Sequence, residues 1–211
     1  MIIGLIGFIG SGKDTVADML VNDHGFMRES FAGTLKDAVA SIFGWDRDML
    51  EGKTKEAREQ RDIVDQWWAA RLAIPHLTPR WILQQWGTEV GRVGFHTDIW
   101  IASLENKLRK TTENIVVSDC RFPNELALVK NAGGIIIWVK RGSLPSWYDL
   151  AVNAATGDTH AAAELYRLGV HASETAWCGS ESDIVIDNNG TLSELYVQVA
   201  KSLVQSHPSC I

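Results

Sequence analysis

The fold is decided by the stretch Gly7-Phe8-Ile9-Gly10-Ser11-Gly12-Lys13, which directly follows the apolar run Ile2–Ile6. That run predicts a short buried strand, and the apolar residues Val16, Met19 and Leu20 fall on one face of a helix predicted after it. A GxxxxGK pattern between a strand and a helix is typical of a phosphate loop. In such a loop, backbone N–H groups surround phosphate oxygens and the lysine reaches the outer phosphates. The sequence therefore predicts a site for a nucleoside triphosphate, with ATP as the expected ligand.

The residues after the lysine depart from the general pattern. A Ser or Thr usually follows directly, whereas Asp14 stands there and Thr15 comes one place later. This Lys-x-Thr spacing matches a variant found in nucleoside and nucleotide monophosphate kinases. We expect Thr15 to contact Mg²⁺ and Asp14 to act at the same metal, directly or through water. Asp14 could instead lie near the acceptor or only complement the N-terminus of the helix.

The composition describes a globular protein. The 211 residues are 45% hydrophobic and 22% charged, which suits one domain with a sizeable core, and the formal net charge is −6. Proteins that grip long nucleic acids are more often basic, so no direct nucleic-acid binding is expected. The scattered residues Cys120, Cys178 and Cys210 fit a reducing compartment better than a disulfide framework or a zinc site. We find neither a signal peptide nor a membrane-spanning stretch, which predicts a soluble, cytoplasmic protein.

Four further apolar runs alternate with helical patterns. These predicted strands lie at residues 26–31, 115–118, 135–139 and 183–186. Continuous apolar strands separated by helices predict an α/β fold, in which a parallel sheet of about five strands carries helices on both faces. Together with the phosphate loop, this pattern predicts a three-layer fold.

Two of the helical patterns are well defined. One predicts a buried face formed by Leu35, Ala38, Val39 and Ile42. The other begins at the capping box Thr191-x-x-Glu194 and continues into the last predicted helix. The residues of that helix expected to point inward are Leu192, Leu195, Val199 and Leu203. The tail at residues 206–211 is expected to fray.

Two stretches interrupt the alternation of strands and helices. Residues 45–75 are dense in mixed charge, and residues 142–180 are rich in alanine, glycine and serine. We interpret both as insertions on a single domain that covers residues 1–211. The first belongs to a substrate-side insertion at about residues 45–100, and the second is a lid at about residues 142–180 that can close over the phosphates.

Charged residues follow two of the predicted strands. Asp119 comes directly after residues 115–118, where open α/β sheets bind ligands and where a carboxylate can orient Mg²⁺ or contact the acceptor. Its alternative role is that of a helix N-cap. Arg121 and Arg141 are expected around the transferred phosphoryl group, because arginine donors match its oxygens. Arg167 could contribute from the lid, although a solvated surface position is the alternative for Arg141 and Arg167. The predicted catalytic residues are Lys13, Asp119, Arg121 and Arg141.

Residues 78–104 carry the side chains expected at the acceptor. Thr78-Pro79 predicts the start of a helix, and five of the nine tryptophans lie between residues 67 and 100. A tryptophan ring can stack on a base while neighbouring polar side chains read the edges of the base. Core packing is the favoured role of Trp81 and Trp100, whereas stacking and packing are balanced for Trp86. The residues expected on the acceptor side are Phe31, Lys36, Trp86, Thr88, Glu89, Arg92 and Arg121.

Taken together, these segments resemble the deoxynucleoside monophosphate kinases of tailed bacteriophages. The resemblance covers nearly the whole chain, and only its phosphate loop is generic. Thr34, where proline is more usual, is a mild departure. The shared motifs are Gly7-x-x-Gly10-Ser11-Gly12-Lys13-Asp14-Thr15, Ser30-Phe31-Ala32, Leu35-Lys36-Asp37, Phe43-Gly44-Trp45, Gln85-x-Gly87-Thr88-Glu89 with Arg92, Trp100, Asp119-x-Arg121-Phe122-x-Asn124-Glu125, Gly133-Gly134, Arg141 and His171-x-Ser173-Glu174.

This resemblance implies a specific reaction. It implies transfer of the γ-phosphate of ATP, with Mg²⁺, to a deoxynucleoside monophosphate, which gives a diphosphate for phage DNA synthesis. It also implies a phosphate-loop fold of the nucleoside monophosphate kinase type, a homodimer, and a phage protein at work in the host cytoplasm. Lys13, Thr15, Arg121 and Arg141 would act on the phosphates, and Glu174 in the lid would help to bind nucleotides.

Two alternatives stay open at the level of the sequence. One is a kinase of another small acceptor, such as dephospho-coenzyme A or a phosphorylated alcohol, and the aromatic segment at residues 78–100 weighs against it. The other is a non-catalytic regulatory or packaging protein that uses ATP as a switch. Two arginines in the same chain as the phosphate loop favour catalysis instead.

Overall fold

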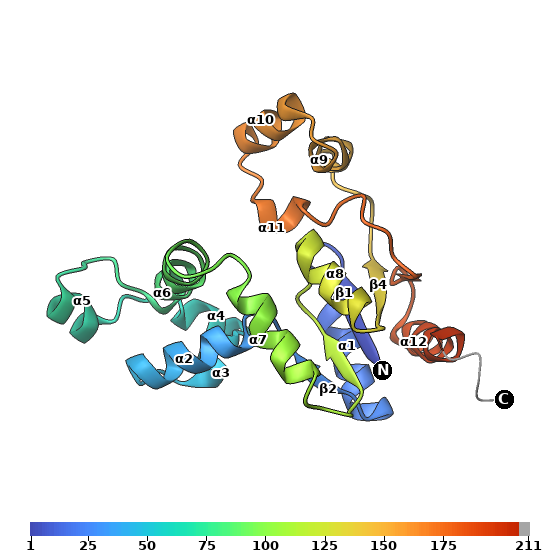
Figure 1. The fold of residues 1–211 in the computed structure, drawn as a ribbon, viewed down its shortest axis with the longest axis horizontal. Helices are drawn as coiled ribbons and strands as arrows, with labels where there is room; N and C mark the ends of the chain where they lie inside the picture. The colour runs from blue at the N-terminus through green and yellow to red at the C-terminus, as the bar shows by residue number, and fades with distance from the viewer. Residues whose placement is uncertain (207–211) are drawn as a thin grey trace. The chain divides into compact units, whose positions relative to one another are not determined.

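The computed structural model describes residues 1–206, and five parallel strands form its sheet (Figure 1). The strands are β1 (Ile2–Ile6), β2 (Met27–Glu29), β3 (Ile115–Val117), β4 (Ile135–Lys140) and β5 (Ile184–Asp187). They lie in the order β2-β3-β1-β4-β5, so β1 is central and delivers the phosphate loop to the middle of the sheet. Ile3 of β1 is in register with Val116 of β3 and with Ile135 of β4. The predicted parallel sheet of five strands is confirmed.

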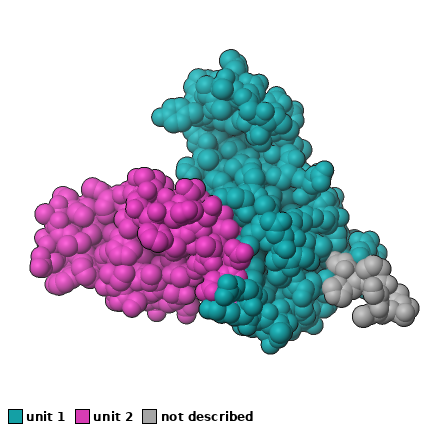
Figure 2. Space-filling view, viewed as in Figure 1, with its two compact units in different colours: residues 1–30, 108–211 teal, residues 31–107 magenta. Residues whose placement is uncertain are grey.

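Helices cover both faces of this sheet (Figure 1). The sheet and these helices belong to the first of two compact units, which comprises residues 1–30 and the described part of 108–211 (Figure 2). On one face, α1 (Lys13–His24) and α12 (Leu192–Ser206) bury a shared core against the strands, in which Leu20 and Leu195 pack with Leu5. On the other face, α8 (Pro123–Asn131) packs against β1 and β4. The predicted three-layer α/β fold is therefore present.

Three short helices occupy the stretch predicted as a lid. They are α9 (Tyr148–Ala155), α10 (Thr159–Arg167) and α11 (Ala172–Thr175). α9 packs against both α10 and α11, so the stretch has its own small core, in which Ala151, Ala161 and Leu165 are buried. The lid belongs to the same compact unit as the sheet.

The second compact unit, Phe31–Lys107, is coloured magenta in Figure 2. Within it the chain forms helices and no strands. Its core is made by Leu35, Val39 and Phe43 together with Leu77 and Ile82. The unit starts earlier and ends later than the insertion expected at about 45–100, while the single-domain organisation stays a prediction. Its helices are α2 (Gly33–Phe43), α3 (Arg47–Glu51), α4 (Lys55–Gln60), α5 (Gln66–Leu72), α6 (Pro79–Gln84), the π-helix η1 (Gln85–Val93) and α7 (Ile99–Leu108).

The predicted helix starts are confirmed, but two predicted core positions are wrong. Thr78 caps α6 by accepting from the N–H of Trp81 at 3.1 Å, and Thr191 and Glu194 form the expected capping box. Ile42 is 49% exposed, because the buried face of α2 continues through Phe43. Leu192 is 60% exposed, because it is the first residue of α12 and lies beyond the edge of the core.

Some predictions concern the end of the chain. Residues 207–211 lie outside the described part, and so do Cys210 and most of the tail expected to fray. Across residues 1–206, none of the helices combines the length and the apolar character that crossing a bilayer requires.

Candidate active site

The phosphate loop connects β1 to α1, and its shape depends on glycine. Gly12 has φ of 98°, a left-handed conformation that other residues rarely adopt, and it is the N-cap residue of α1. A side chain there would lie 2.3 Å from Nδ2 of Asn188, which donates to the carbonyl of Ser11 at 2.9 Å. Because Gly12 provides no side-chain cap, the N–H groups of the first turn of α1 stay available to an anion.

Two further observations fit a phosphate ligand at this loop. Ser11 is only 3% exposed, and its Oγ has no hydrogen-bond partner within residues 1–206. The Nζ of Lys13 donates to the carbonyls of Gly7 at 2.7 Å and Phe8 at 2.9 Å. Lys13 thus rests on the loop itself, with no carboxylate in ion-pair contact among the described residues, and its charge remains to be met by a ligand.

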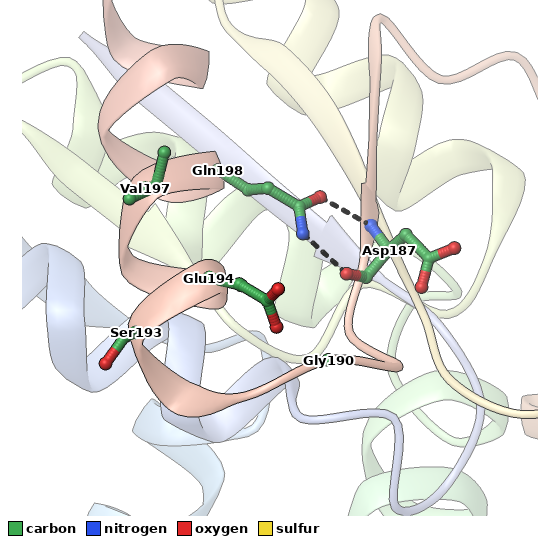
Figure 3. Close-up of a pocket in the computed structure, with 6 residues that line it drawn as sticks. All are labelled: Asp187, Gly190, Ser193, Glu194, Val197 and Gln198. Atoms are coloured by element: carbon green, nitrogen blue, oxygen red, sulfur yellow. Dashed lines mark hydrogen bonds between the residues drawn. The ribbon is translucent and has the colours of Figure 1, made fainter.

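A pocket of about 530 Å³ opens between the end of β5 and the start of α12 (Figure 3). Gln198 closes one wall by exchanging two hydrogen bonds with the backbone of Asp187, at 2.9 and 2.6 Å. The next residue, Asn188, is the one that holds the carbonyl of Ser11. The pocket contains none of the site residues predicted from the sequence, and the predicted chemistry lies at the loop and not in this pocket.

Arg121 and Glu174 lie near Lys13. The pKa of Lys13 is lowered to about 8, first by burial and then by the positive charge of Arg121, while Asp14 and Glu174 oppose the shift. Arg121 is exposed, and its Nη1 donates to Oγ of Ser173 at 3.3 Å. The structure therefore brings together four of the predicted residues: Lys13, Asp14, Arg121 and Glu174.

The backbone of Arg121 is held by a residue that the sequence analysis did not place in the site. The carboxylate of Glu125 is 3% exposed and accepts from the N–H groups of Arg121 at 2.8 Å and Phe122 at 3.2 Å. This contact fixes the turn that follows β3. A glutamate three residues after a helix N-cap is a recognisable signal, and it could have been used here.

Asp119 lies half-buried at the carboxyl end of β3. Its alternative role as a helix cap is wrong, because α8 begins at Pro123 and Phe122 is the N-cap residue. The functional role of Asp119 stays a prediction.

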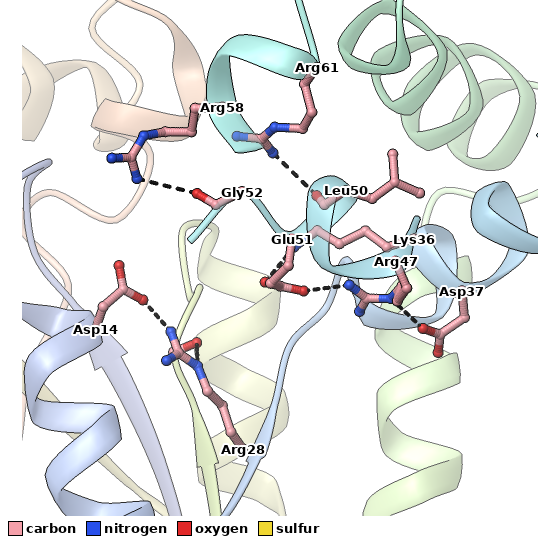
Figure 4. Close-up of polar contacts among 11 residues, drawn as sticks. Asp14, Arg28, Lys36, Asp37, Arg47, Leu50, Glu51, Gly52, Arg58 and Arg61 are labelled. Atoms are coloured by element: carbon pink, nitrogen blue, oxygen red, sulfur yellow. Dashed lines mark hydrogen bonds and ion pairs between the residues drawn. The ribbon is translucent and has the colours of Figure 1, made fainter. Parts of the chain in front are cut away.

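The Asp14 carboxylate forms an ion pair with Arg28 of β2 (Figure 4). Arg28 also donates to Asp18 and to Oγ of Ser118, each at 3.0 Å, and so links α1 to the end of β3. The sequence analysis did not identify Arg28, because its partners are 10 to 90 residues away along the chain. Thr15 is exposed beside this pair.

The expected Mg²⁺ would depend on few protein ligands. Within residues 1–206 there is no group of three or more His, Cys, Asp or Glu side chains that could hold a metal by itself. This fits Mg²⁺ in a nucleotide site, because the ion is usually bound by one or two side chains together with substrate phosphates and water. Thr15 and Asp14 could supply those side-chain oxygens.

The lid and the phosphate loop share an aromatic cluster. The ring of Phe8 lies 5.5 Å from Trp147 and 4.8 Å from Trp177, measured between ring centroids, and 6.1 Å from Tyr148. Arg141, which follows β4 at the start of the lid stretch, is exposed and has neither a hydrogen bond nor an ion pair within the described chain.

The other polar residues of the lid stabilise its helices. Arg167 forms two hydrogen bonds with Glu164 at 2.9 and 2.6 Å, which is the surface role considered for it. His171 caps α11 through the N–H of Ser173 at 3.2 Å.

The second unit contains the remaining acceptor-side residues. Phe31 is buried, and Nζ of Lys36 is paired with Glu51 at 2.8 Å. Trp86 lies 5.8 Å from Phe43 between ring centroids and is packed against the core of the unit, as are Trp81 and Trp100. The core role expected of Trp81 and Trp100 is confirmed.

The predicted acceptor segment forms a π-helix, which the sequence did not reveal. Its widened turn is seen where the N–H of Gly94 donates to the carbonyl of Glu89 at 2.8 Å, five residues back. Thr88 and Glu89 are exposed on it and Arg92 is half-buried. π-helices are rare and frequently occur at functional sites, so this geometry agrees with the prediction without testing it.

A parallel sheet with a phosphate loop after its first strand is the arrangement of phosphate-loop nucleotide-binding proteins, and an arginine close to the lysine of the loop is typical of those that cleave or transfer a phosphoryl group. A protein of Acanthamoeba polyphaga mimivirus, provisionally named deoxynucleotide monophosphate kinase, is 31% identical over 214 residues, which cover 94% of each protein. The deoxynucleoside-5′-monophosphate kinase of Escherichia phage T5 is 28% identical over 179 residues, or 62% of this chain and 72% of the phage protein. The chain belongs to the deoxynucleoside monophosphate kinase family, as the resemblance of its motifs predicted.

Similarity to solved structures is lower. Shikimate kinase from Aquifex aeolicus has a TM-score of 0.48 and 15% identity, over 99% of each chain. No protein-family model matches the sequence.

Proposed function

We propose that the protein transfers the γ-phosphate of ATP to a deoxynucleoside 5′-monophosphate and so forms ADP and a deoxynucleoside diphosphate. Membership of the family supports this proposal. The observation that carries it is the placement of Lys13 and Arg121 beside a glycine-shaped helix start, because phosphoryl transfer needs cations around the transferred group.

The chemistry requires positioning and charge stabilisation, with no covalent intermediate. An oxygen of the acceptor phosphate attacks the γ-phosphorus, and the bond from that phosphorus to the oxygen bridging it to the β-phosphate breaks, with ADP as the leaving group. In the proposal, Lys13 leaves the carbonyls of Gly7 and Phe8 and binds the β- and γ-phosphate oxygens. Arg121 neutralises charge on the transferred group, while Glu125 holds its backbone in place.

The remaining predicted residues have proposed roles in the same reaction. Arg141 joins the phosphates when the lid closes, and Glu174 helps to bind nucleotides. Asp119 orients the metal shell or contacts the acceptor. Thr15 and Asp14 would hold Mg²⁺, which would neutralise negative charge on the phosphates. The proposed acceptor-side residues are Phe31, Lys36, Trp86, Thr88, Glu89, Arg92 and Arg121.

Further parts of the proposal rest on the family resemblance. They are a homodimer and a role in supplying precursors for viral DNA synthesis in the host cytoplasm. Light scattering on the purified full chain tests the first, and a mass equal to one chain would contradict it.

A coupled assay of ADP release tests the reaction. Each reaction contains ATP, Mg²⁺ and one acceptor. The acceptors are the four deoxynucleoside monophosphates, AMP and dephospho-coenzyme A. We expect turnover with at least one deoxynucleotide at a kcat/KM above those for AMP and dephospho-coenzyme A. Turnover with dephospho-coenzyme A alone would support the rival kinase, and ATP binding without any transfer would support the regulatory protein.

A further inference from the structure

The second unit contains a cluster of cations around α3, its following residue Gly52, and α4 (Figure 4). Most of them are neutralised by carboxylates. Lys36 and Arg47 share Glu51 at 2.8 and 2.7 Å, and Arg47 also reaches Asp37 at 2.7 Å. In the same cluster, Arg80 forms an ion pair with Asp62.

Two arginines of the cluster have no such carboxylate. Within residues 1–206, Arg58 and Arg61 form no ion pair, and both donate to backbone carbonyls at the end of α3. Nη1 of Arg61 donates to Leu50 at 3.3 Å. Nη1 of Arg58 donates to Gly52 at 3.2 Å and to Lys53 at 3.1 Å.

Gly52 makes room for the Arg61 guanidinium. It ends α3 with φ of 67°, and a side chain on it would lie 2.3 Å from Nη2 and 2.4 Å from Cζ of Arg61. A guanidinium can therefore rest on this turn only because residue 52 is glycine. The Arg61 side chain is thereby held against the backbone while most of its donors remain unused.

The positive charge of Arg61 is only partly compensated by its surroundings. Its Nε is buried and lacks an acceptor within the described residues. Burial lowers the pKa of Arg61, and the neighbouring charge of Arg80 lowers it further. The side chains joined by the contacts above comprise five cations (Lys36, Arg47, Arg58, Arg61 and Arg80) and three carboxylates (Asp37, Glu51 and Asp62). Arg58 and Arg61 are the two of these cations without a carboxylate in ion-pair contact within residues 1–206, although the exposed Glu56 lies near Arg58.

We propose that Arg58 and Arg61 form a binding site for a phosphate monoester dianion. Two guanidinium groups offer planar, forked donors that match phosphate oxygens, and both rest on backbone carbonyls and not on carboxylates. This inference rests on the proposed function, in which the monoester is the 5′-phosphate of the deoxynucleotide acceptor. Lys36, which is already paired with Glu51, then shapes the site through Glu51 and Arg47 and does not bind the phosphate directly.

The test compares Arg58→Gln and Arg61→Lys with the control Arg71→Gln, at an exposed position of α5, in the full-length protein. Arg61→Lys keeps a charge and a donor for Leu50 but loses the fork, and Arg58 is exposed, so its replacement should leave folding intact. We expect each of the first two variants to raise the KM of the best deoxynucleotide about tenfold or more. The KM of ATP should stay within about twofold of wild type in all three variants, since changes away from a ligand site are usually small.

A merely structural role at the end of α3 predicts a different result. It would lower the unfolding temperature and alter the KM values of both substrates together. An unchanged KM for the deoxynucleotide in both Arg58→Gln and Arg61→Lys would overturn the inference.

Thermal shift measurements with the deoxynucleoside monophosphate, the deoxynucleoside and orthophosphate identify the ligand. Stabilisation by the monophosphate that exceeds that by orthophosphate, and that is lost in Arg61→Lys, supports the acceptor assignment. A response to orthophosphate alone would overturn it in favour of a free-phosphate site. If no deoxynucleotide is turned over and yet the monophosphate still stabilises the protein through Arg61, the proposed function fails while the anion site stands.

Discussion

Lys13 and Arg121 of the first unit are held in a different way from Lys36 and Arg47 of the second unit. In the first unit, Lys13 rests on the carbonyls of Gly7 and Phe8, and the guanidinium of Arg121 donates to the hydroxyl of Ser173. In the second unit, Lys36 and Arg47 are tied to carboxylates. A cation that donates to neutral oxygens can still be neutralised by an anionic ligand, whereas a cation in an ion pair is already neutralised by a carboxylate of the protein. The comparison indicates that the contacts of a cation, and not its presence alone, identify an anion site.

The largest expected effect concerns the lysine of the first unit. Lys13→Ala should abolish measurable transfer, a loss of at least about 10³-fold in kcat/KM, because Lys13 is the side chain proposed to bind both the β- and the γ-phosphate oxygens. The unfolding temperature should not fall, since the substitution removes a largely buried charge. Lys201→Ala is the matched control, because Lys201 is an exposed lysine of α12. Its kcat/KM should equal that of wild type. Retained transfer in Lys13→Ala would contradict the proposed site.

The next effect separates backbone shape from charge. Gly12→Ala should raise the KM of ATP about tenfold and cost about 1–3 kcal/mol of stability, because the left-handed backbone and the nearby Asn188 both oppose a side chain. Gly25→Ala is the control, since it has φ of 70° with open space around it at the far end of α1. It should cost about 1 kcal/mol and leave the KM of ATP unchanged. Equal KM values in the two variants would show that loop shape is unimportant.

A third prediction probes the neutralised cations of the second unit. The contacts of Glu51 with Lys36 and Arg47 hold its pKa at about 2, well below the usual 4.5, even though burial acts in the opposite direction. A lowered carboxylate pKa contributes stability that is fully present above pH 4.5 and is lost as the pH falls toward 2. Glu51→Gln should therefore lower the free energy of unfolding by about 1–3 kcal/mol near neutral pH.

Urea denaturation of Glu51→Gln and wild type at several pH values tests this assignment. The difference between the two proteins should shrink as the pH falls from 4.5 to 2. Glu59→Gln is the control, because Glu59 is exposed and its contact with Lys55 is 3.7 Å long. We expect a change within about 0.5 kcal/mol for this control. A pH-independent difference for Glu51→Gln would contradict the ion-pair assignment.

The smallest effect concerns the pH dependence of ATP binding. Because the pKa of Lys13 is about 8 without ligand, and bound phosphate favours the charged form, binding above pH 8 must take up a proton. The Kd of ATP should therefore rise about fivefold between pH 8 and 9 and stay nearly constant below pH 7. Calorimetry in buffers of different ionisation enthalpy counts the protons taken up. Lys13→Arg, whose charge persists, should show no such uptake, and uptake in this variant would assign the proton to another group.

The part of the fold nearest the phosphate loop could be predicted from the sequence with little error. The strand Ile2–Ile6, the loop and α1 depend on local patterns, and so do the caps at Thr78 and Thr191. The helical periodicity of α2 wrongly predicted that Ile42 is buried. Phe43 is buried instead, and its ring stacks on that of Trp45 with 4.5 Å between the centroids.

The side-chain pairs of the site could not be predicted in the same way. Arg28 finds Asp14 and Ser118, and Glu51 finds Lys36, only after the chain has folded. The sequence could identify Lys36 as a cation expected near the acceptor. It could not show that the carboxylate of Glu51 already neutralises this cation. The π-helix at Gln85–Val93 also escaped prediction, since its pattern of apolar residues resembles that of an ordinary helix.

Phe8 connects the lysine of the phosphate loop to two tryptophans, whose fluorescence could report the binding of substrate. Its carbonyl accepts from Lys13, and its ring contacts Trp147 and Trp177, so movement of Lys13 onto ATP should change the fluorescence of those tryptophans. Of the nine tryptophans, six lie in the second unit and three in the first. Variants that keep the tryptophans of one unit would let stopped-flow fluorescence follow the binding of donor and acceptor as separate events. The order in which they bind could then be measured without labelling the protein.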